Sequence, residues 1–422
     1  MLHARGLYKV FGRRPEDAVR RLQEGATVAD VRDDGATPAV VDVGFTVRPG
    51  EIFVVMGLSG SGKSTLLRML NGLLPPTAGS VTLDGEELTE LDRAGLRRVR
   101  QERMSMVFQH FALLPHRSVL QNAAYALEVR GVDRRTRSDR AREALSLVGL
   151  ADRADASPAQ LSGGMQQRVG LARALAADTD LLLMDEAFSA LDPLIRRGMQ
   201  DQLLDLQRDL GKTIVFITHD LNEAMRLGDR VAVMRDGRIV QCDTPEQILT
   251  APADDYVAQF LADVDRSRVV TAGSLAEPVA VLPPSAGPGE TGAELARTGA
   301  DHLVLAEPGG PVHGVLAAAD AGSGSAGQAA PPAACVPADA PLADLLGPAA
   351  ATGHPVVVVD EARRPVGVVP VTALLAALSP AAGEPGAHDG VPAGAPDAEL
   401  ADRRAGDDHD DRHDDDREVA GV

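Results

Sequence analysis

The sequence predicts an α/β protein in which helices cover a mostly parallel sheet. Short apolar runs bounded by turn residues are typical of buried strands in such a sheet. Four occur in the first part of the chain: EIFVVM (51–56), LLLMD (181–185), TIVFIT (213–218) and RVAVM (230–234). Residues 196–210 instead have helical periodicity, with one apolar face made of Met199, Leu203, Leu206 and Leu210. Alternating strands and helices predict a layered α/β architecture.

Length, charge and cysteine content narrow the class of protein. A chain of 422 residues is long enough for about two or three domains. Its net charge of −19 argues against a broad nucleic-acid-binding surface. It has no apolar run long enough to span a bilayer, and its first residues, MLHARGLYKVFGRR, lack the apolar core of a signal peptide. Because it has only two cysteines, Cys242 and Cys335, we expect a cytosolic protein in a reducing compartment.

A glycine-rich loop follows the first predicted strand. Residues 57–64 match the pattern G-x-x-x-x-G-K-[S/T], and a helical pattern, STLLRMLNGL, begins directly after Lys63. In this setting backbone N–H groups and a helix N-terminus surround phosphate oxygens. Lys63 is expected to reach the β- and γ-phosphates of ATP, and Ser64 to ligate Mg²⁺. The predicted nucleotide-binding residues of this loop are Gly57, Ser59, Gly60, Ser61, Gly62, Lys63, Ser64 and Thr65.

Two carboxylates end the second predicted strand, in LLLMDE (181–186). Asp185 is predicted to organise Mg²⁺, and Glu186 to act as the catalytic base that polarises the attacking water. Two solvated acids at a strand end are the alternative. The phosphate loop favours the catalytic interpretation.

Two further polar residues follow strand-like runs. His219 ends TIVFIT, so we expect it at the same sheet edge as Glu186, where it can contact the γ-phosphate. Gln109 ends a short apolar run in MVFQHFALLP. A second Ser-Gly-Gly turn lies in LSGGMQQ (161–167), directly before a helical pattern. It is either an ordinary loop-to-helix junction or a second anion site.

Taken in order, these motifs resemble the nucleotide-binding subunit of an ABC transporter over residues 1 to about 262. The resemblance also rests on SALD (189–192), and LSGG is its most discriminating part. It implies a P-loop ABC-type domain with a helical subdomain. It further implies that two copies dimerise head to tail, each ATP lying between one phosphate loop and the partner's signature. The residues assigned in this way are Ser162, Gly163, Gly164 and Asp192 for the nucleotide, Gln109 and His219 for catalysis, and Gln109 again for Mg²⁺.

The same resemblance assigns an aromatic residue to the adenine ring. Phe11, in LYKVFG, is expected to stack on adenine, and Tyr8 is a weaker candidate. An ordinary core phenylalanine is the alternative. A long insertion, of helical character in one branch of the family, separates Phe11 from the strand at 51–56.

That branch is the quaternary-amine uptake family, which imports glycine betaine and proline. The sequence segments that resemble this family include MVFQHFALLPHRSVLQN and VFITHDLNEAMRLGDRVAVM. The resemblance implies an ATPase on the cytoplasmic face of the plasma membrane, coupled to permease subunits and indirectly to a substrate-binding protein. Residues 111–120 would then meet the permease; a plain helical-subdomain surface is the alternative. Two other functions stay open: import of another polar solute such as an amino acid, and a soluble ABC ATPase unrelated to transport.

Ala, Gly and Pro dominate the sequence after about residue 265. Two strand-rich islands form a weak repeat that resembles degenerate CBS modules, at residues 266–322 and 333–380. The resemblance places a ribose-contacting acid six positions after a strand glycine: Asp320 follows Gly314 in this way, but Ala373 follows Gly367. Nucleotide binding and a regulatory or dimerising scaffold both stay open. Residues 381–422 hold an acidic run that mixes Asp and His, for which disorder is expected over metal binding.

Overall fold

A six-stranded sheet forms the centre of the first part of the chain. In the computed structural model, which describes residues 1–109, 112–189, 191–321 and 333–378, the strand order is β10-β9-β3-β8-β7-β6. Only β10 runs antiparallel to its neighbour; the other pairs are parallel. The strands are β3 (Ile52–Met56), β6 (Met104–Val107), β7 (Leu181–Asp185), β8 (Thr213–Thr218), β9 (Arg230–Arg235) and β10 (Arg238–Asp243). This arrangement confirms the α/β prediction.

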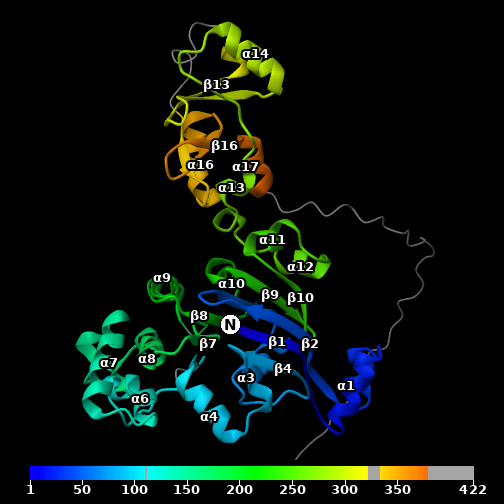
Figure 1. Cartoon of the computed structure of the whole chain (residues 1–422), viewed down its shortest axis with the longest axis vertical. Helices are drawn as coiled ribbons and strands as arrows, with labels where there is room; N and C mark the ends of the chain where they lie inside the picture. The colour runs from blue at the N-terminus through cyan, green and yellow to red at the C-terminus, as the bar shows by residue number, and fades with distance from the viewer. Residues whose placement is uncertain (110–111, 190, 322–332, 379–422) are drawn as a thin grey trace, which may run out of the picture. The chain divides into compact units, whose positions relative to one another are not determined.

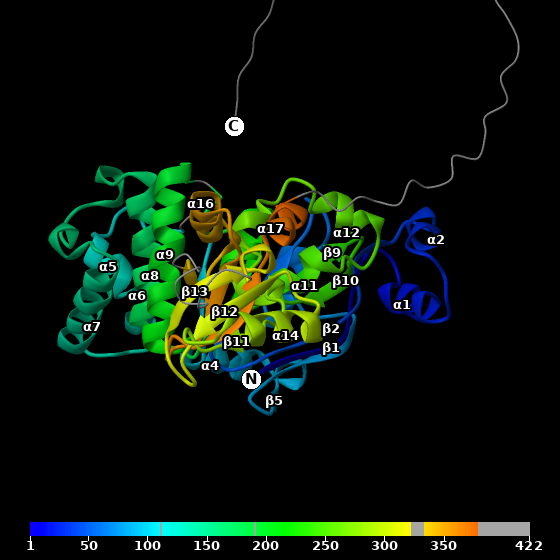
Figure 2. The same ribbon diagram turned by 90° about the horizontal axis from the view of Figure 1, so that it is seen from above.

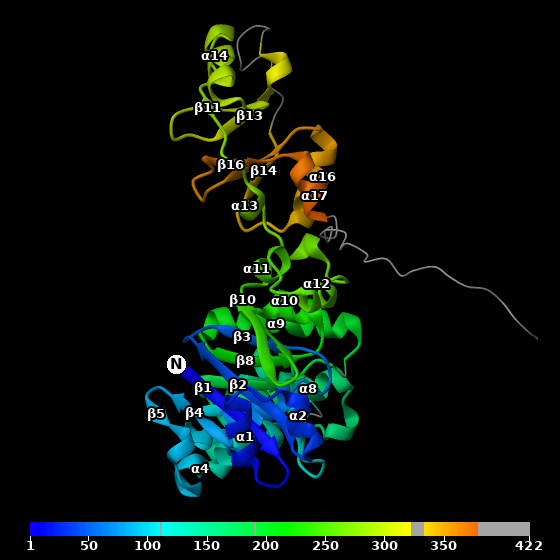
Figure 3. The same cartoon turned by 90° about the vertical axis from the view of Figure 1, so that its right-hand side faces the viewer.

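A smaller antiparallel sheet with the order β2-β1-β4-β5 lies beside it (Figure 3). Its strands are β1 (Leu2–Phe11), β2 (Thr37–Val47), β4 (Ala78–Leu83) and β5 (Glu86–Glu87). The long insertion forms α1 (Pro15–Gln23) and α2 (Val28–Asp33) between β1 and β2. Thr27 and Asp30 form a capping box at the start of α2. β1 and β2 pair with each other although the insertion separates them in the sequence.

The two faces of the large sheet bury different helices. Alternate residues of a strand point to opposite faces, so Phe53 and Val55 pack with the small sheet, α3 (Lys63–Leu70) and α4 (Arg93–Glu102). Val54 and its alternate neighbours pack with α8 (Gly163–Ala176), α9 (Pro193–Leu210) and α10 (Leu221–Leu227). Of the predicted apolar face of α9, Leu210 is 42% exposed because it closes the helix before Gly211.

Helices α5 (Val119–Ala123), α6 (Tyr125–Val129), α7 (Arg134–Leu147) and α8 contact one another and form a group at one side of the sheet (Figure 2). After β10 the chain continues through α11 (Pro245–Thr250), α12 (Asp255–Phe260) and α13 (Ala272–Leu275). In the part of the chain that the structure describes, no helix is long and apolar enough to cross a membrane.

Two small three-stranded sheets follow, and they share one topology (Figure 1). In each, the first strand is parallel to the middle one, which pairs antiparallel with the third. The first module consists of β11 (Val281–Leu282), α14 (Pro288–Thr298), β12 (His302–Ala306) and β13 (Val312–Ala317). The second consists of β14 (Cys335–Pro337), α16 (Leu342–Thr352), β15 (Val356–Val359), β16 (Pro365–Val369) and α17 (Val371–Leu378). The weak sequence repeat is therefore a structural repeat.

Buried valines from both modules form one cluster between the two sheets: Val304, Val315, Val357, Val359 and Val368. Sequence analysis did not predict α14 or α16, which lie in stretches rich in small residues. The side chain of Asp320 and the whole acidic run at 381–422 lie outside the described residues, so the predictions made for them stay predictions.

Candidate active site

The glycine-rich loop connects β3 to α3. Gly62 precedes α3 with φ of 103°, and a Cβ atom there would lie 2.2 Å from the carbonyl oxygen of Ala39, so only glycine is accommodated. The Nζ atom of Lys63 is buried and donates to the carbonyl oxygens of Gly57 (2.8 Å) and Leu58 (3.0 Å). Burial lowers the pKa of Lys63. The hydroxyl of Ser61 is buried without a hydrogen-bond partner among the described residues, as expected of a loop shaped for a polar ligand.

Asp185 lies next to the start of α3. The hydroxyl of Ser64 donates to Oδ1 of Asp185 over 3.2 Å, although the two residues are far apart in the sequence. Burial raises the pKa of Asp185, and the nearby negative charge of Glu186 adds to the effect. A hydroxyl and a carboxylate oxygen are ligands that Mg²⁺ accepts, so this pair is chemically suited to that ion.

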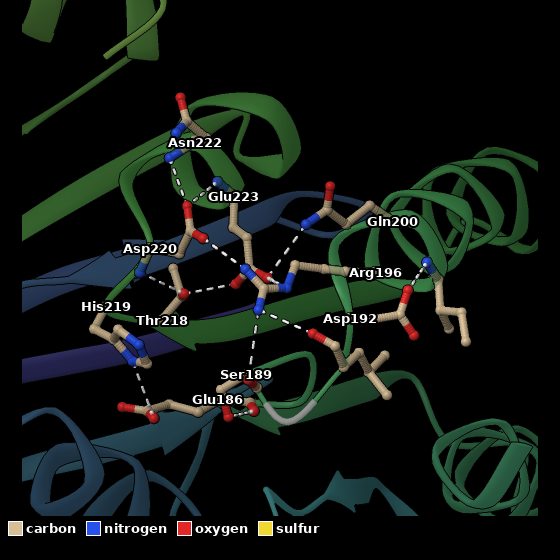
Figure 4. Close-up of polar contacts among 12 residues, drawn as sticks. Glu186, Ser189, Asp192, Arg196, Gln200, Thr218, His219, Asp220, Asn222 and Glu223 are labelled. Carbon is tan, nitrogen blue, oxygen red and sulfur yellow. Dashed lines mark hydrogen bonds and ion pairs between the residues drawn. The ribbon is translucent and has the colours of Figure 1, made fainter. Parts of the chain in front are cut away.

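Glu186 is the point at which three segments meet. Its backbone lies in the left-handed region, with φ of 43°, and its N–H donates to the carbonyl oxygen of Ile217 in β8. Nε2 of Gln109 donates to Oε2 of Glu186 over 3.1 Å. Nδ1 of His219 lies 3.1 Å from the same oxygen (Figure 4). The structure thus brings together all three residues that the sequence proposed for catalysis, because β6, β7 and β8 end at one edge of a parallel sheet.

Ser189, Leu191 and Asp192, called the 189–192 loop below, follow Glu186 in the chain; Ala190 lies outside the described residues. The hydroxyl of Ser189 donates to the carbonyl oxygen of Glu186 (2.9 Å), and Gln109 reaches the same hydroxyl over 3.5 Å. Asp192 is exposed, and its carboxylate accepts from the N–H of Ile195, which makes it the N-cap of α9. The expectation for Asp192 named only a nucleotide contact; its capping role was missed.

The Ser-Gly-Gly turn starts α8. Ser162 is the N-cap of this helix, accepting from the N–H of Met165, and Ser162 and Gly163 are exposed. Gly164 is buried, and a Cβ atom there would lie 2.6 Å from Cγ2 of Ile195 in α9. No hydrogen bond within the described residues joins this turn to the phosphate loop. The turn therefore has two exposed residues at a helix N-terminus that could meet an anion from outside the chain.

The two aromatic candidates differ in exposure. Phe11 is 43% exposed, and Nζ of Lys9 lies 5.3 Å from its ring centroid. Tyr8 is buried in the small core that includes α1 and α2. Exposure therefore favours Phe11 as a ring that a ligand could stack on. Phe111, at the start of the predicted permease-facing segment, lies outside the described residues.

Comparison with known proteins identifies the family. The family described as ABC transporter matches residues 40–189. The glycine betaine transport ATP-binding protein OpuAA of Bacillus subtilis is 46% identical over 378 residues, which is 88% of this chain and 90% of that protein. The chain belongs to the family of ABC transporter ATP-binding proteins.

Two further relatives each match about two thirds of this ABC transporter ATPase. The glycine betaine/carnitine transport protein GbuA of Listeria monocytogenes is 56% identical, covering 64% of this chain and 68% of that protein. The trimethylamine N-oxide transport protein TmoW of Ruegeria pomeroyi is 54% identical, covering 65% and 81%. The prediction of a nucleotide-binding ATPase is thereby confirmed.

Sequence reasoning about this ATPase missed a polar cluster behind Glu186. A hydrogen bond joins Thr218, at the end of β8, to Glu223 in α10, and an ion pair joins Glu223 to Arg196 in α9 (Figure 4). Thr218 and Glu223 lie in VFITHDLNEAMRLGDRVAVM, and Arg196 begins the helical pattern at 196–210, but the sequence analysis gave none of the three a role. Both helices carry charges on nearly every turn, so the pairing becomes visible only in three dimensions.

Proposed function

We propose that this ATPase hydrolyses ATP with Glu186 as the general base. Lys63 and the other loop residues at 57–65 would bind the phosphates, and His219 would contact the γ-phosphate. The observation that carries the proposal is that Gln109 and His219 both lie 3.1 Å from Oε2 of Glu186. A carboxylate held at this point can orient a water and accept its proton.

Magnesium is the second component of the proposed site. Ser64, Asp185 and Gln109 would hold Mg²⁺, which when bound neutralises charge on the phosphate oxygens. The 3.2 Å contact between Ser64 and Asp185 supports the assignment. Because burial raises the pKa of Asp185, a bound cation would favour its carboxylate form.

A second copy of the chain would complete each site. Ser162, Gly163 and Gly164 would donate to the γ-phosphate of an ATP bound by the partner copy, Asp192 would lie at the same interface, and Phe11 would stack on adenine. The exposure of Ser162 and Gly163 at the start of α8 supports this arrangement.

For the cargo, we propose glycine betaine or a related quaternary amine taken up by an importer. The relatives are named for glycine betaine, carnitine and trimethylamine N-oxide, which are all small methylated amines. The ATPase would act on the cytoplasmic face of the plasma membrane with permease subunits, and a substrate-binding protein would deliver the cargo. Import of another polar solute, such as an amino acid, and a soluble ATPase without a permease are the alternatives.

Replacing the proposed base tests the hydrolysis. Glu186→Gln keeps the size and the contact to Gln109 but removes the base, so turnover should fall about 10²- to 10⁴-fold, and an ATP-bound dimer should accumulate in light scattering. Glu143→Gln, an exposed change in α7, is the matched control and should hydrolyse ATP like the parent. Near-normal turnover in Glu186→Gln would contradict the assignment.

Reconstitution with the cognate permease and binding protein tests the cargo. ATP-driven uptake of labelled glycine betaine should be competed by carnitine and proline betaine and not by methionine. Competition by an amino acid alone would favour import of another polar solute. ATPase activity that does not change when a permease is added would favour a soluble ATPase.

We also propose that the two C-terminal modules form a degenerate CBS-like pair. Their shared topology and common valine cluster support it. Calorimetry on the parent and on Lys63→Ala distinguishes a nucleotide site in the modules from a scaffold. A second adenine-nucleotide site whose affinity Lys63→Ala leaves unchanged would indicate a ligand site in the modules, and a single site that Lys63→Ala weakens would indicate a scaffold.

A further inference from the structure

The guanidinium of Arg196 links two loops at the active-site edge. Arg196 lies in the first turn of α9, four residues after Asp192. Its Nη2 atom donates to the carbonyl oxygens of Ser189 (3.5 Å) and Leu191 (3.1 Å), and its Nη1 atom donates to Oδ2 of Asp220 (3.0 Å). One planar side chain therefore holds the 189–192 loop and the segment that follows β8 (Figure 4).

Asp220 is itself fixed by its neighbours. Its Oδ1 atom accepts from the N–H groups of Asn222 (2.9 Å) and Glu223 (3.2 Å), which makes Asp220 the N-cap of α10. Its own N–H donates to the hydroxyl of Thr218. His219 is the residue between Thr218 and Asp220, so both of its chain neighbours are anchored.

A buried acid supports the same guanidinium. Glu223 is 3% exposed and accepts from the hydroxyl of Thr218 (2.6 Å) and from Nε2 of Gln200 (3.2 Å). Nε of Arg196 lies 3.7 Å from Oε1 of Glu223. The charge of Arg196 is thus balanced by two carboxylates, which stabilises one orientation of its fork.

The two linked loops meet again at Glu186. The 189–192 loop contributes the hydroxyl of Ser189 to the backbone of Glu186, and the other segment places His219 against the side chain of Glu186. The hydrogen bonds of Arg196 go to the two loops, and its ion pairs are with Asp220 and Glu223. We propose that Arg196 is a positioning residue that keeps His219 and the 189–192 loop aligned around Glu186 during ATP hydrolysis. This inference rests on the proposed function of Glu186.

Three variants in the full-length protein test the inference: Arg196→Ala, Arg196→Lys and Arg197→Ala. Arg196→Ala should lower kcat for ATP about 10- to 100-fold, because small displacements of catalytic groups have effects of this order, and should leave KM for ATP unchanged. Arg196→Lys should recover part of the loss, since an ammonium group cannot span all three acceptors as a planar fork does. Arg197→Ala changes the adjacent, exposed arginine and should keep the parent kcat.

A double-mutant cycle adds a readout that a purely structural role would not give. Asp220→Asn keeps the side-chain size and a capping oxygen, and should lower kcat less than Arg196→Ala does. If Arg196 acts through Asp220, the double variant should be no slower than Arg196→Ala alone. Asp220→Asn also provides the test if Arg196→Ala fails to fold.

Three results would overturn the inference: parent kcat in a folded Arg196→Ala protein, an equal loss in Arg197→Ala, or a rise in KM at constant kcat, which would mean a direct contact with ATP. Failure of the proposed function can be told apart from failure of this inference. If Glu186 is not the base, Glu186→Gln would hydrolyse ATP at the parent rate, whatever the Arg196 variants do.

Discussion

The carboxyl edge of the large sheet and the interface between the two small sheets are built from opposite kinds of side chain. At the edge, polar groups from segments far apart in the sequence meet on Glu186, whose backbone has an unfavourable positive φ. Between the small sheets, five buried valines form an apolar cluster. Catalytic geometry needs hydrogen bonds with fixed directions, whereas a scaffold needs only complementary shape. The two regions should therefore respond differently to substitution.

Among the substitutions that compare these two regions, the largest effect is expected from Lys63→Ala. Lys63→Ala removes the buried ammonium group that the loop holds at Gly57 and Leu58. Loss of one electrostatic contact to a transferring group lowers kcat about 10²- to 10³-fold, which a coupled ATPase assay would measure. Lys212→Ala removes a lysine from an ion pair with exposed Asp178 and should have no such effect. Equal activities of the two variants would break the distinction between the edge and the rest of the molecule.

The second prediction concerns the valine cluster. Val357 is completely buried, and Val357→Ala should lower the free energy of unfolding by about 1–3 kcal/mol. Val366→Ala, at a position 55% exposed in β16, should change it by less than about 0.5 kcal/mol. Denaturant unfolding would measure both, and the ATPase kcat should match the parent in each. A loss of turnover in Val357→Ala would show that the two regions are coupled.

The comparison also explains which features the sequence could predict. Residues 57–65 directly follow β3 and Asp185 is the last residue of β7, so a local pattern was enough to place them at one edge. Arg196 and Glu223 act through contacts between α9 and α10 that no local pattern encodes. In the modules, β12 and β15 stood out as apolar runs, whereas α14 and α16 did not, because small residues suit helix and loop alike and only packing selects the helix.

The smallest effect is expected from the ionisation of Glu223, which should make the stability of the protein depend on pH. It is also the sharpest test of the difference in polarity between the two regions. Burial raises the pKa of this carboxyl above its ordinary value of 4.5. The folded state then binds a proton more tightly than the unfolded state, so the contribution of Glu223 to stability declines as the pH rises from about 4.5 through the folded-state pKa.

Glu223→Gln cannot ionise, and Gln200 can still donate to its carbonyl oxygen. The Tm of this variant relative to the parent should therefore increase across that range and level off above it, by about 2–4 °C for each kcal/mol removed. Glu143→Gln should leave the Tm difference flat. A flat difference for Glu223→Gln as well would mean that Arg196 and Thr218 fully compensate the buried charge, and the edge would then be no more sensitive to pH than the valine interface.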